Sequence, residues 1–155
     1  MEQGIGISNT LAWSPDETRF YFADSLKSRI FVYDYDAESG AISGKRSFFD
    51  ASGFGMPDGS AMDVDGCLWN ARWGVGRVLR ITPDGDIDRQ IEIPALQPSS
   101  CAFGGPKLDT LFITSARIAL SAEALAHLPL SGSVFAISGV GQGLPISHMR
   151  WEGLQ

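Results

Sequence analysis

The sequence predicts an all-β fold, a β-propeller made of about three four-stranded blades. The first observation is an internal repeat, in which three stretches share one plan and can be aligned on Trp13, Met62 and Phe103. The spacings between these anchors are 49 and 41 residues, which is typical of propeller blades. A β-sandwich is the rival architecture, but a sandwich would not repeat this closely.

The second observation is that each repeat contains short segments rich in β-branched and aromatic residues, separated by turn signals. Pro-containing turns follow the first segment at 14–17 and the third segment of the second repeat at 82–85, and Asp65-Gly66 favours a tight hairpin. Segments 47–49 and 87–93 supply a fourth strand in the first two repeats. The expected strands are 9–13, 20–24 and 29–33, then 58–62, 67–71 and 77–81, then 99–103, 110–114 and 133–137.

One helical segment interrupts the third repeat. Residues 121–128 are good helix formers, with Ser121 as a candidate cap and Pro129 as a stop. We therefore expect one domain over 1–155, a partial propeller with repeats at about 9–50, 58–94 and 99–151. Three blades do not close a ring, so missing N-terminal blades or a second chain are needed to complete it.

Composition excludes several functional classes. The net charge is −6, and the 12 Lys and Arg residues form no run, which argues against nucleic acid and anionic membrane surfaces as partners. Two cysteines without a Cys-x-x-Cys motif, Cys67 and Cys101, are expected to be buried free thiols. No apolar run is long enough for a membrane span, and the first residues lack signal-peptide character, so a cytoplasmic location is expected.

Equivalent positions of the repeats carry candidate ligands. Asn9, Asp58 and Ser99 each precede their anchor residue by four positions, at the start of the innermost strand. Oxygen donors at matching positions of adjacent blades converge on one mouth of the central channel, where they could bind a hard cation. The alternative is that these residues cap strands or form Asx turns.

Several motifs together carry a family resemblance. They are Ile7-Ser8-Asn9-Thr10-Leu11-Ala12-Trp13-Ser14, Pro57-Asp58-Gly59-Ser60-Ala61-Met62-Asp63, Ser100-Cys101-Ala102-Phe103-Gly104-Gly105, Gly76-Arg77-Val78-Leu79-Arg80 and Leu111-Phe112-Ile113-Thr114-Ser115-Ala116-Arg117. In this order they closely resemble the second half of the regucalcin (senescence marker protein) and gluconolactonase family, from about Gly6 to Arg150.

The resemblance implies half of a six-bladed ring that binds one divalent metal, calcium or zinc, and hydrolyses sugar lactones. Asn9 matches a metal-ligating asparagine, and Asp58 matches a metal-ligating aspartate that is also proposed as the catalytic base. The family's remaining ligands, a glutamate and a second asparagine, have no counterpart in these 155 residues. We therefore expect little lactonase activity from the chain by itself.

Other candidate sites are weaker. The acidic segments starting at Asp34 and Asp63 lack the Gly and Glu that an EF-hand loop requires, and they are expected to be turns. His127 and His148 have no partner at metal-ligand spacing. Arg72 and Trp73 either belong to the core or line the channel mouth.

Three functions compete at this point. The leading hypothesis is a metal-dependent sugar lactonase in which a cation activates water and Asp58 is the base. The alternatives are a non-catalytic calcium-binding regulatory protein of the same family and an inactive truncated remnant.

Overall fold

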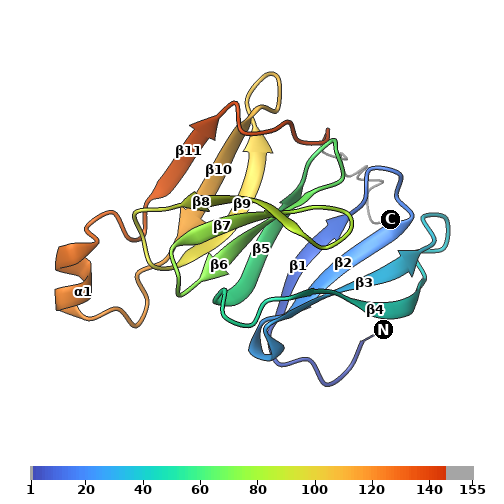
Figure 1. The fold of residues 1–155 in the computed structure, drawn as a ribbon, viewed down its shortest axis with the longest axis horizontal. Coiled ribbons are helices and arrows are strands. Elements are labelled where there is room, and N and C mark those ends of the chain that lie inside the picture. The colour runs from blue at the N-terminus through green and yellow to red at the C-terminus, as the bar shows by residue number, and fades with distance from the viewer. Residues whose placement is uncertain (1, 146–155) are drawn as a thin grey trace, which may run out of the picture.

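The computed structural model describes residues 2–145, which fold into three antiparallel sheets placed side by side (Figure 1). In the first two sheets the strand order follows the chain, so each is a four-stranded meander. The first sheet contains β1 (Ser8–Trp13), β2 (Arg19–Asp24), β3 (Arg29–Tyr35) and β4 (Ile42–Asp50). The second contains β5 (Met56–Met62), β6 (Leu68–Trp73), β7 (Arg77–Ile81) and β8 (Ile87–Glu92).

The third sheet has three strands within the described residues: β9 (Pro98–Gly104), β10 (Thr110–Ser115) and β11 (Val134–Ser138). The expected helix is confirmed as α1 (Ala122–His127), with Ser121 accepting a hydrogen bond from the Ala124 amide at 3.1 Å. It lies between β10 and β11, as predicted. The end of the third expected repeat, up to residue 151, and His148 lie outside the described residues.

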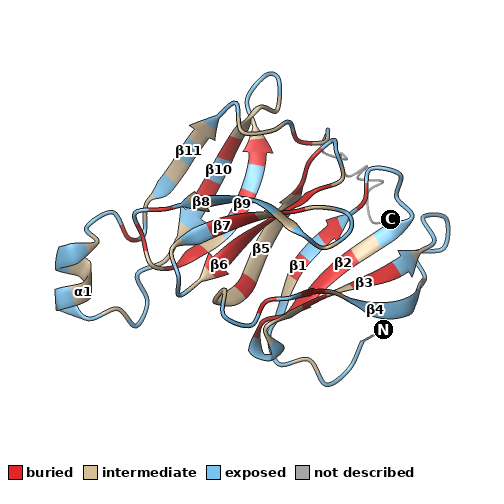
Figure 2. Cartoon of the chain, viewed as in Figure 1, coloured by how far each residue is buried: buried red, intermediate tan, exposed pale blue. Residues whose placement is uncertain are grey.

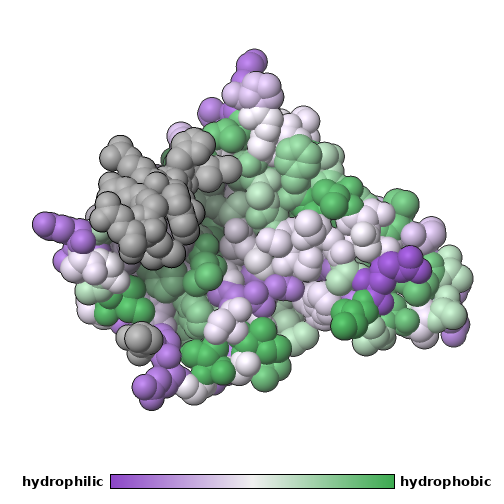
Figure 3. Space-filling view, turned by 180° about the vertical axis from the view of Figure 1, so that it is seen from behind, coloured by the Kyte–Doolittle hydropathy of each residue, from purple (hydrophilic) through white to green (hydrophobic). Residues whose placement is uncertain are grey.

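The expected all-β, unclosed propeller architecture is confirmed, and its core lies between the sheets. One buried cluster joins the first and second sheets, and another joins the second and third around Trp69 and Leu111. The middle sheet is therefore covered on both faces, and in β6 only Trp73 is not fully buried (Figure 2). Seen from behind, exposed apolar residues form patches broken by hydrophilic ones (Figure 3).

Short turns and buried thiols also follow the expectation. The Gly66 amide donates a hydrogen bond to the Asp63 carbonyl at 3.0 Å. The Asp63 carboxylate accepts hydrogen bonds from the Cys67 amide at 2.9 Å and from the Trp69 indole at 2.8 Å. Asp63 therefore stabilises the hairpin that joins β5 to β6. Cys67 and Cys101 are both buried and unpaired. Among residues 2–145, no helix is both long and apolar enough to cross a membrane.

Candidate functional site

The innermost strand of each sheet is irregular at the aligned candidate residue or directly after it. In β1, residues 10 and 11 together face one residue of β2, and in β5, residues 58 and 59 face one residue of β6. In β9, Ser99 is the extra residue between two pairs with β10. A β-bulge of this kind re-aims side chains and is common beside functional sites. The three repeats therefore share a local distortion as well as a sequence position.

Asn9 and Asp58 line the same pocket. Its volume is about 280 Å³, and its walls come from the start of β1, the start of β5 and the end of β6. Ile7, Asn9, Ser25, Met56, Pro57, Asp58 and Trp73 form the lining. Ser99 is not part of this lining; its hydroxyl is 2.9 Å from that of Thr114 on the neighbouring strand. The structure thus brings together two of the three aligned residues.

The Asn9 side chain is fixed by a hydrogen bond from its amide nitrogen. Its amide nitrogen donates to Ser25 Oγ at 2.9 Å, and Ser25 Oγ donates to the Pro57 carbonyl at 2.6 Å. Ser25 begins the 3₁₀ turn η1 (Ser25–Lys27) and is almost fully buried. Because the nitrogen is bound in this way, Oδ1 is the atom of Asn9 left to act as a ligand; it accepts no hydrogen bond from the described residues.

Asp58 is fixed through its backbone, while its carboxylate has no ion-pair partner among the described residues. The Asp58 carbonyl accepts from Thr10 Oγ1 at 2.7 Å and from Asn70 Nδ2 at 3.0 Å. The side chain is half-buried, and this burial raises the pKa of the Asp58 carboxyl above its ordinary value, although the Gly59 amide partly opposes the shift. A half-buried carboxylate without a cation is a chemically suitable partner for a metal ion.

Arg72 stabilises the position of Asp58 indirectly, through hydrogen bonds to neighbouring residues. It is fully buried, and its guanidinium donates to the Phe54 carbonyl at 2.9 Å, the Gly55 carbonyl at 2.6 Å and Asn70 Oδ1 at 2.6 Å. No described carboxylate neutralises it, and burial lowers the pKa of Arg72 to about 10. Arg72 therefore holds both the loop that leads into β5 and the amide that binds the Asp58 carbonyl.

The sequence analysis did not identify Thr10, Ser25 or Asn70 as supporting residues. A signal was present for Asn70, because it and Arg72 are polar residues at alternate positions of an otherwise apolar strand, Leu-Trp-Asn-Ala-Arg-Trp. Of the two residues considered for the channel mouth, Trp73 does line the pocket and Arg72 does not.

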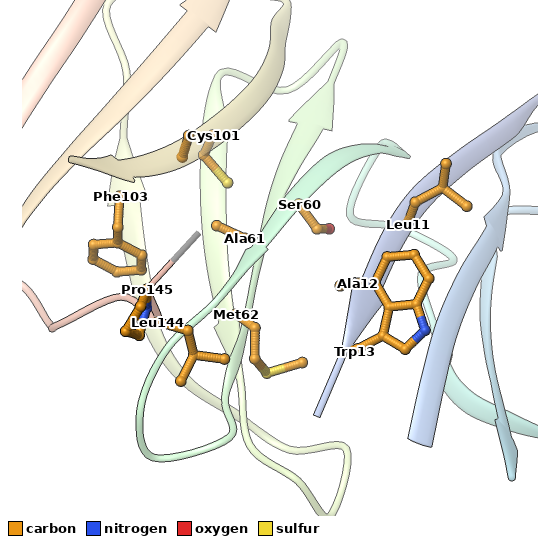
Figure 4. Close-up of a pocket in the computed structure, with 11 residues that line it drawn as sticks. Leu11, Ala12, Trp13, Ser60, Ala61, Met62, Cys101, Phe103, Leu144 and Pro145 are labelled. Carbon is orange, nitrogen blue, oxygen red and sulfur yellow. The ribbon is translucent and has the colours of Figure 1, made fainter. Parts of the chain in front are cut away.

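A second hollow lies farther along the innermost strands. It measures about 230 Å³, and its walls include residues from β1, β5 and β9 together with Leu144 and Pro145. Met62 of β5 points toward Trp13 of β1 across this hollow (Figure 4). Both hollows are thus lined largely by apolar side chains, and the one where the innermost strands begin also carries Asn9, Ser25 and Asp58.

The fold and the pocket define a class: a partial β-propeller in which an amide and a carboxylate side chain from two adjacent sheets line one pocket. The family model described as SMP-30/Gluconolactonase/LRE-like region matches residues 1–117. This chain therefore belongs to the SMP-30/gluconolactonase/LRE-like family.

Named relatives agree with this assignment. Regucalcin of Danio rerio is 41% identical over 144 residues, covering 91% of this chain and 49% of the relative. The 6-deoxy-6-sulfogluconolactonase of Pseudomonas putida is 45% identical over 138 residues, covering 88% and 47%. The crystal structure of the calcium-binding protein regucalcin from Agrobacterium tumefaciens superposes with a TM-score of 0.85 at 37% identity, covering 94% of this chain and 50% of that one. The chain spans about half the length of the relatives it matches.

Proposed function

We propose that this chain supplies half of a metal-dependent sugar-lactone hydrolase, in which Asn9 and Asp58 bind one divalent cation, calcium or zinc. The observation that carries the proposal is the shared pocket, which is lined by the amide side chain of Asn9 and by the Asp58 carboxylate, for which the described residues 2–145 supply no ion-pair partner. The Pseudomonas relative is named as a lactonase, which supports the reaction class. We expect the protein to act in the cytoplasm.

The donor set fits a metal in part. Carboxylate and amide oxygens are the ligands that calcium prefers, and zinc also accepts carboxylate. The described residues contain no group of three or more His, Cys, Asp or Glu side chains that could hold an ion. This chain therefore contributes two side-chain ligands and leaves the remaining positions to other donors.

The residues of the pocket have distinct roles in the proposed reaction. A divalent cation supplies Lewis-acid polarisation of the lactone carbonyl and lowers the pKa of water. Asp58 is the carboxylate of the pocket that would take the proton from the attacking water. Asn9, oriented by Ser25, would bind the cation and hold it in position. Trp73 forms an apolar wall against which a sugar ring can lie.

The test measures calcium and zinc binding by titration calorimetry, and gluconolactone hydrolysis by proton release, before and after chelation. Asp58→Asn keeps an oxygen but removes the base, so any turnover should fall by about two to four orders of magnitude. Asn9→Ala should weaken metal affinity and be partly rescued by excess metal. Asp84→Asn, at an exposed turn, is the matched control.

Three results separate the alternatives. Full hydrolysis after exhaustive chelation, or equal responses of the Asp58 and Asn9 variants to added metal, would contradict the proposed roles. Because little hydrolysis is expected of the chain by itself, calcium binding without hydrolysis favours the non-catalytic calcium-binding alternative only when it is found with the remaining blades supplied; the Agrobacterium protein is described as calcium-binding. Absence of both activities would favour the truncated remnant.

A further inference from the structure

Asp24, the last residue of β2, carries a fully buried carboxylate. Its oxygens accept hydrogen bonds from the backbone amides of Gly6 and Ile7 at 3.2–3.3 Å, and Lys27 Nζ lies 3.1 Å from Oδ2. Burial raises the pKa of this carboxyl, but the two amides and the Lys27 ammonium outweigh burial and lower the pKa below its ordinary value. The group is therefore ionised at neutral pH and is held inside the protein by two successive backbone amides and one ammonium group.

Asp24 and its neighbour Ser25 fix the chain that leads into β1. The Ser25 amide donates to the Ile7 carbonyl at 3.0 Å, so Ile7 is bonded through both of its backbone groups. Regular pairing gives this part of β1 little support, because only Ser8 and Asn9 pair with β2 before the bulge. Ile7 and Asn9 both line the candidate pocket. The hydrogen bonds to Asp24 therefore hold one wall of the pocket in place.

Residue 6 packs directly against η1. A Cβ added to Gly6 would lie 2.7 Å from Leu26 Cδ1 and 3.1 Å from Leu26 Cβ. The turn η1 also reaches the second sheet, since Ser25 Oγ donates to the Pro57 carbonyl at the start of β5. Residues 6–9, η1 and the start of β5 thus meet at one end of the first two sheets (Figure 1).

We propose that Asp24 is a positioning residue of the metal site, which fixes the start of β1 and thereby the place of Asn9 relative to Asp58. The inference rests on the proposed function of Asn9 and Asp58. Asp24 is not among the residues that line the pocket, and its oxygens are bonded to backbone amides, so it acts through the backbone and not on the ion. Replacing a residue that orients a metal ligand typically costs about 10- to 100-fold in metal affinity.

Substitutions at Asp24 and at a matched position distinguish positioning from a general loss of stability. Asp24→Ala removes both acceptor oxygens, whereas Asp24→Asn removes the charge and keeps Oδ1, which is bonded to both amides. Asp50→Ala is the control, because Arg29 lies between Asp24 and Asp50 in the register of the first sheet and the Asp50 carboxylate is exposed. Titration calorimetry measures the calcium and zinc affinities, and urea unfolding shows whether each variant is folded in the assay. A loss of stability alone does not change the affinity of a population that stays folded.

We expect Asp24→Ala to bind metal more weakly by about tenfold or more. Asp24→Asn should lose less than about threefold, because the remaining oxygen still accepts from both amides, and Asp50→Ala should match the unaltered chain. Unchanged affinity in Asp24→Ala, or an equal loss in Asp50→Ala, would overturn the inference and leave the proposed function standing. Equal losses in Asp24→Asn and Asp24→Ala would also overturn it, because they would show that the charge of Asp24 acts on the ion directly.

A metal-free measurement separates this inference from the proposed function. With chelator present, the side-chain amide resonances of Asn9 in the NMR spectrum of Asp24→Ala should move toward their positions in the urea-unfolded chain. Asp50→Ala should leave these resonances in place. Resonances that stay in place in Asp24→Ala would overturn the inference. An unaltered chain that binds neither calcium nor zinc would contradict the proposed function, and the resonances would then show whether Asp24 positions Asn9.

A second variant keeps the test decisive if Asp24→Ala does not fold. Gly6→Ala pushes residues 6 and 7 away from η1 and leaves the Asp24 carboxylate intact. It should weaken metal binding by about threefold, less than removal of the carboxylate, because the segment shifts but stays bonded. Leu26→Ala in the same chain should restore part of the affinity, because it removes Cδ1 and Cγ, two of the three atoms closest to the added methyl group. Unchanged affinity in Gly6→Ala, or no recovery in the double variant, would overturn the inference.

Discussion

The close approach of β5 to β9 allows a quantitative test at Gly59. A Cβ added there would lie 2.6 Å from Ser100 Cβ and 2.9 Å from Ser100 Cα, and it would also meet Ser100 Oγ. The hydroxyl can rotate away, but the backbone carbon cannot move without shifting the third sheet. Overpacking typically costs about 1–3 kcal/mol, and the loss of glycine entropy in the unfolded chain returns about 0.4–1 kcal/mol. From the middle of each range, Gly59→Ala should therefore destabilise the fold by about 1.3 kcal/mol.

Urea unfolding followed by tryptophan fluorescence measures this loss, because Trp69 is fully buried between the same two sheets. Ser100→Gly removes two of the three clashing atoms, so the double variant should lose less stability than the sum of the single variants. A loss below about 0.5 kcal/mol for Gly59→Ala, or strictly additive losses in the double variant, would refute the packing argument.

Two further predictions follow from the pKa shifts. In the metal-free chain, burial raises the pKa of Asp58 in the folded state, so stability present at low pH is lost as pH rises through that pKa. Asp58→Asn should therefore melt at a higher temperature than the unaltered chain at pH 7 with chelator, and the gap should close at acidic pH; a lower melting temperature at pH 7 would contradict this. Burial also raises the pKa of Cys67 to about 11 and that of Cys101 to about 12, so a disulfide reagent at pH 7.5 should modify the folded chain at least tenfold more slowly than the urea-unfolded chain. Equal rates would show that the thiols are accessible.

Most of the strands could be predicted because their signals are local. The expected strand 77–81 has the bounds of β7, and its apolar residues are buried on both faces, with Val78 toward the third sheet and Leu79 and Ile81 toward the first. Boundaries shifted where pairing extends a strand beyond its hydrophobic run. β5 begins at Met56 rather than at 58, because Met56 and Pro57 pair with the end of β6 across the bulge.

The residues of the candidate site were likewise predictable where the signal is local and not where it depends on sheet packing. Asn9 and Asp58 could be paired from the sequence, since equivalent positions of adjacent repeats must lie at the same end of adjacent strands. Ser99 occupies the third equivalent position, yet its hydroxyl pairs with Thr114, an interaction that strand register alone decides. Thr10, Ser25 and Arg72 act on residues 17 to 48 positions away, and such contacts depend on how the sheets pack.

The bonds that position Asp58 are also bonds that join the sheets. Thr10 Oγ1 reaches from β1 to the Asp58 carbonyl of β5, and Ser25 Oγ reaches from η1 to the Pro57 carbonyl beside it. Because both carbonyls lie where β5 leaves its regular pairing with β6, side chains from the first sheet satisfy acceptors that the bulge exposes. Asn9 lies on the first sheet and Asp58 on the second, so any separation of the two sheets would also move Asn9 away from Asp58. The geometry of the pocket is thus set by sheet docking rather than by either strand alone, and contacts that hold the sheets together should also hold the pocket in shape.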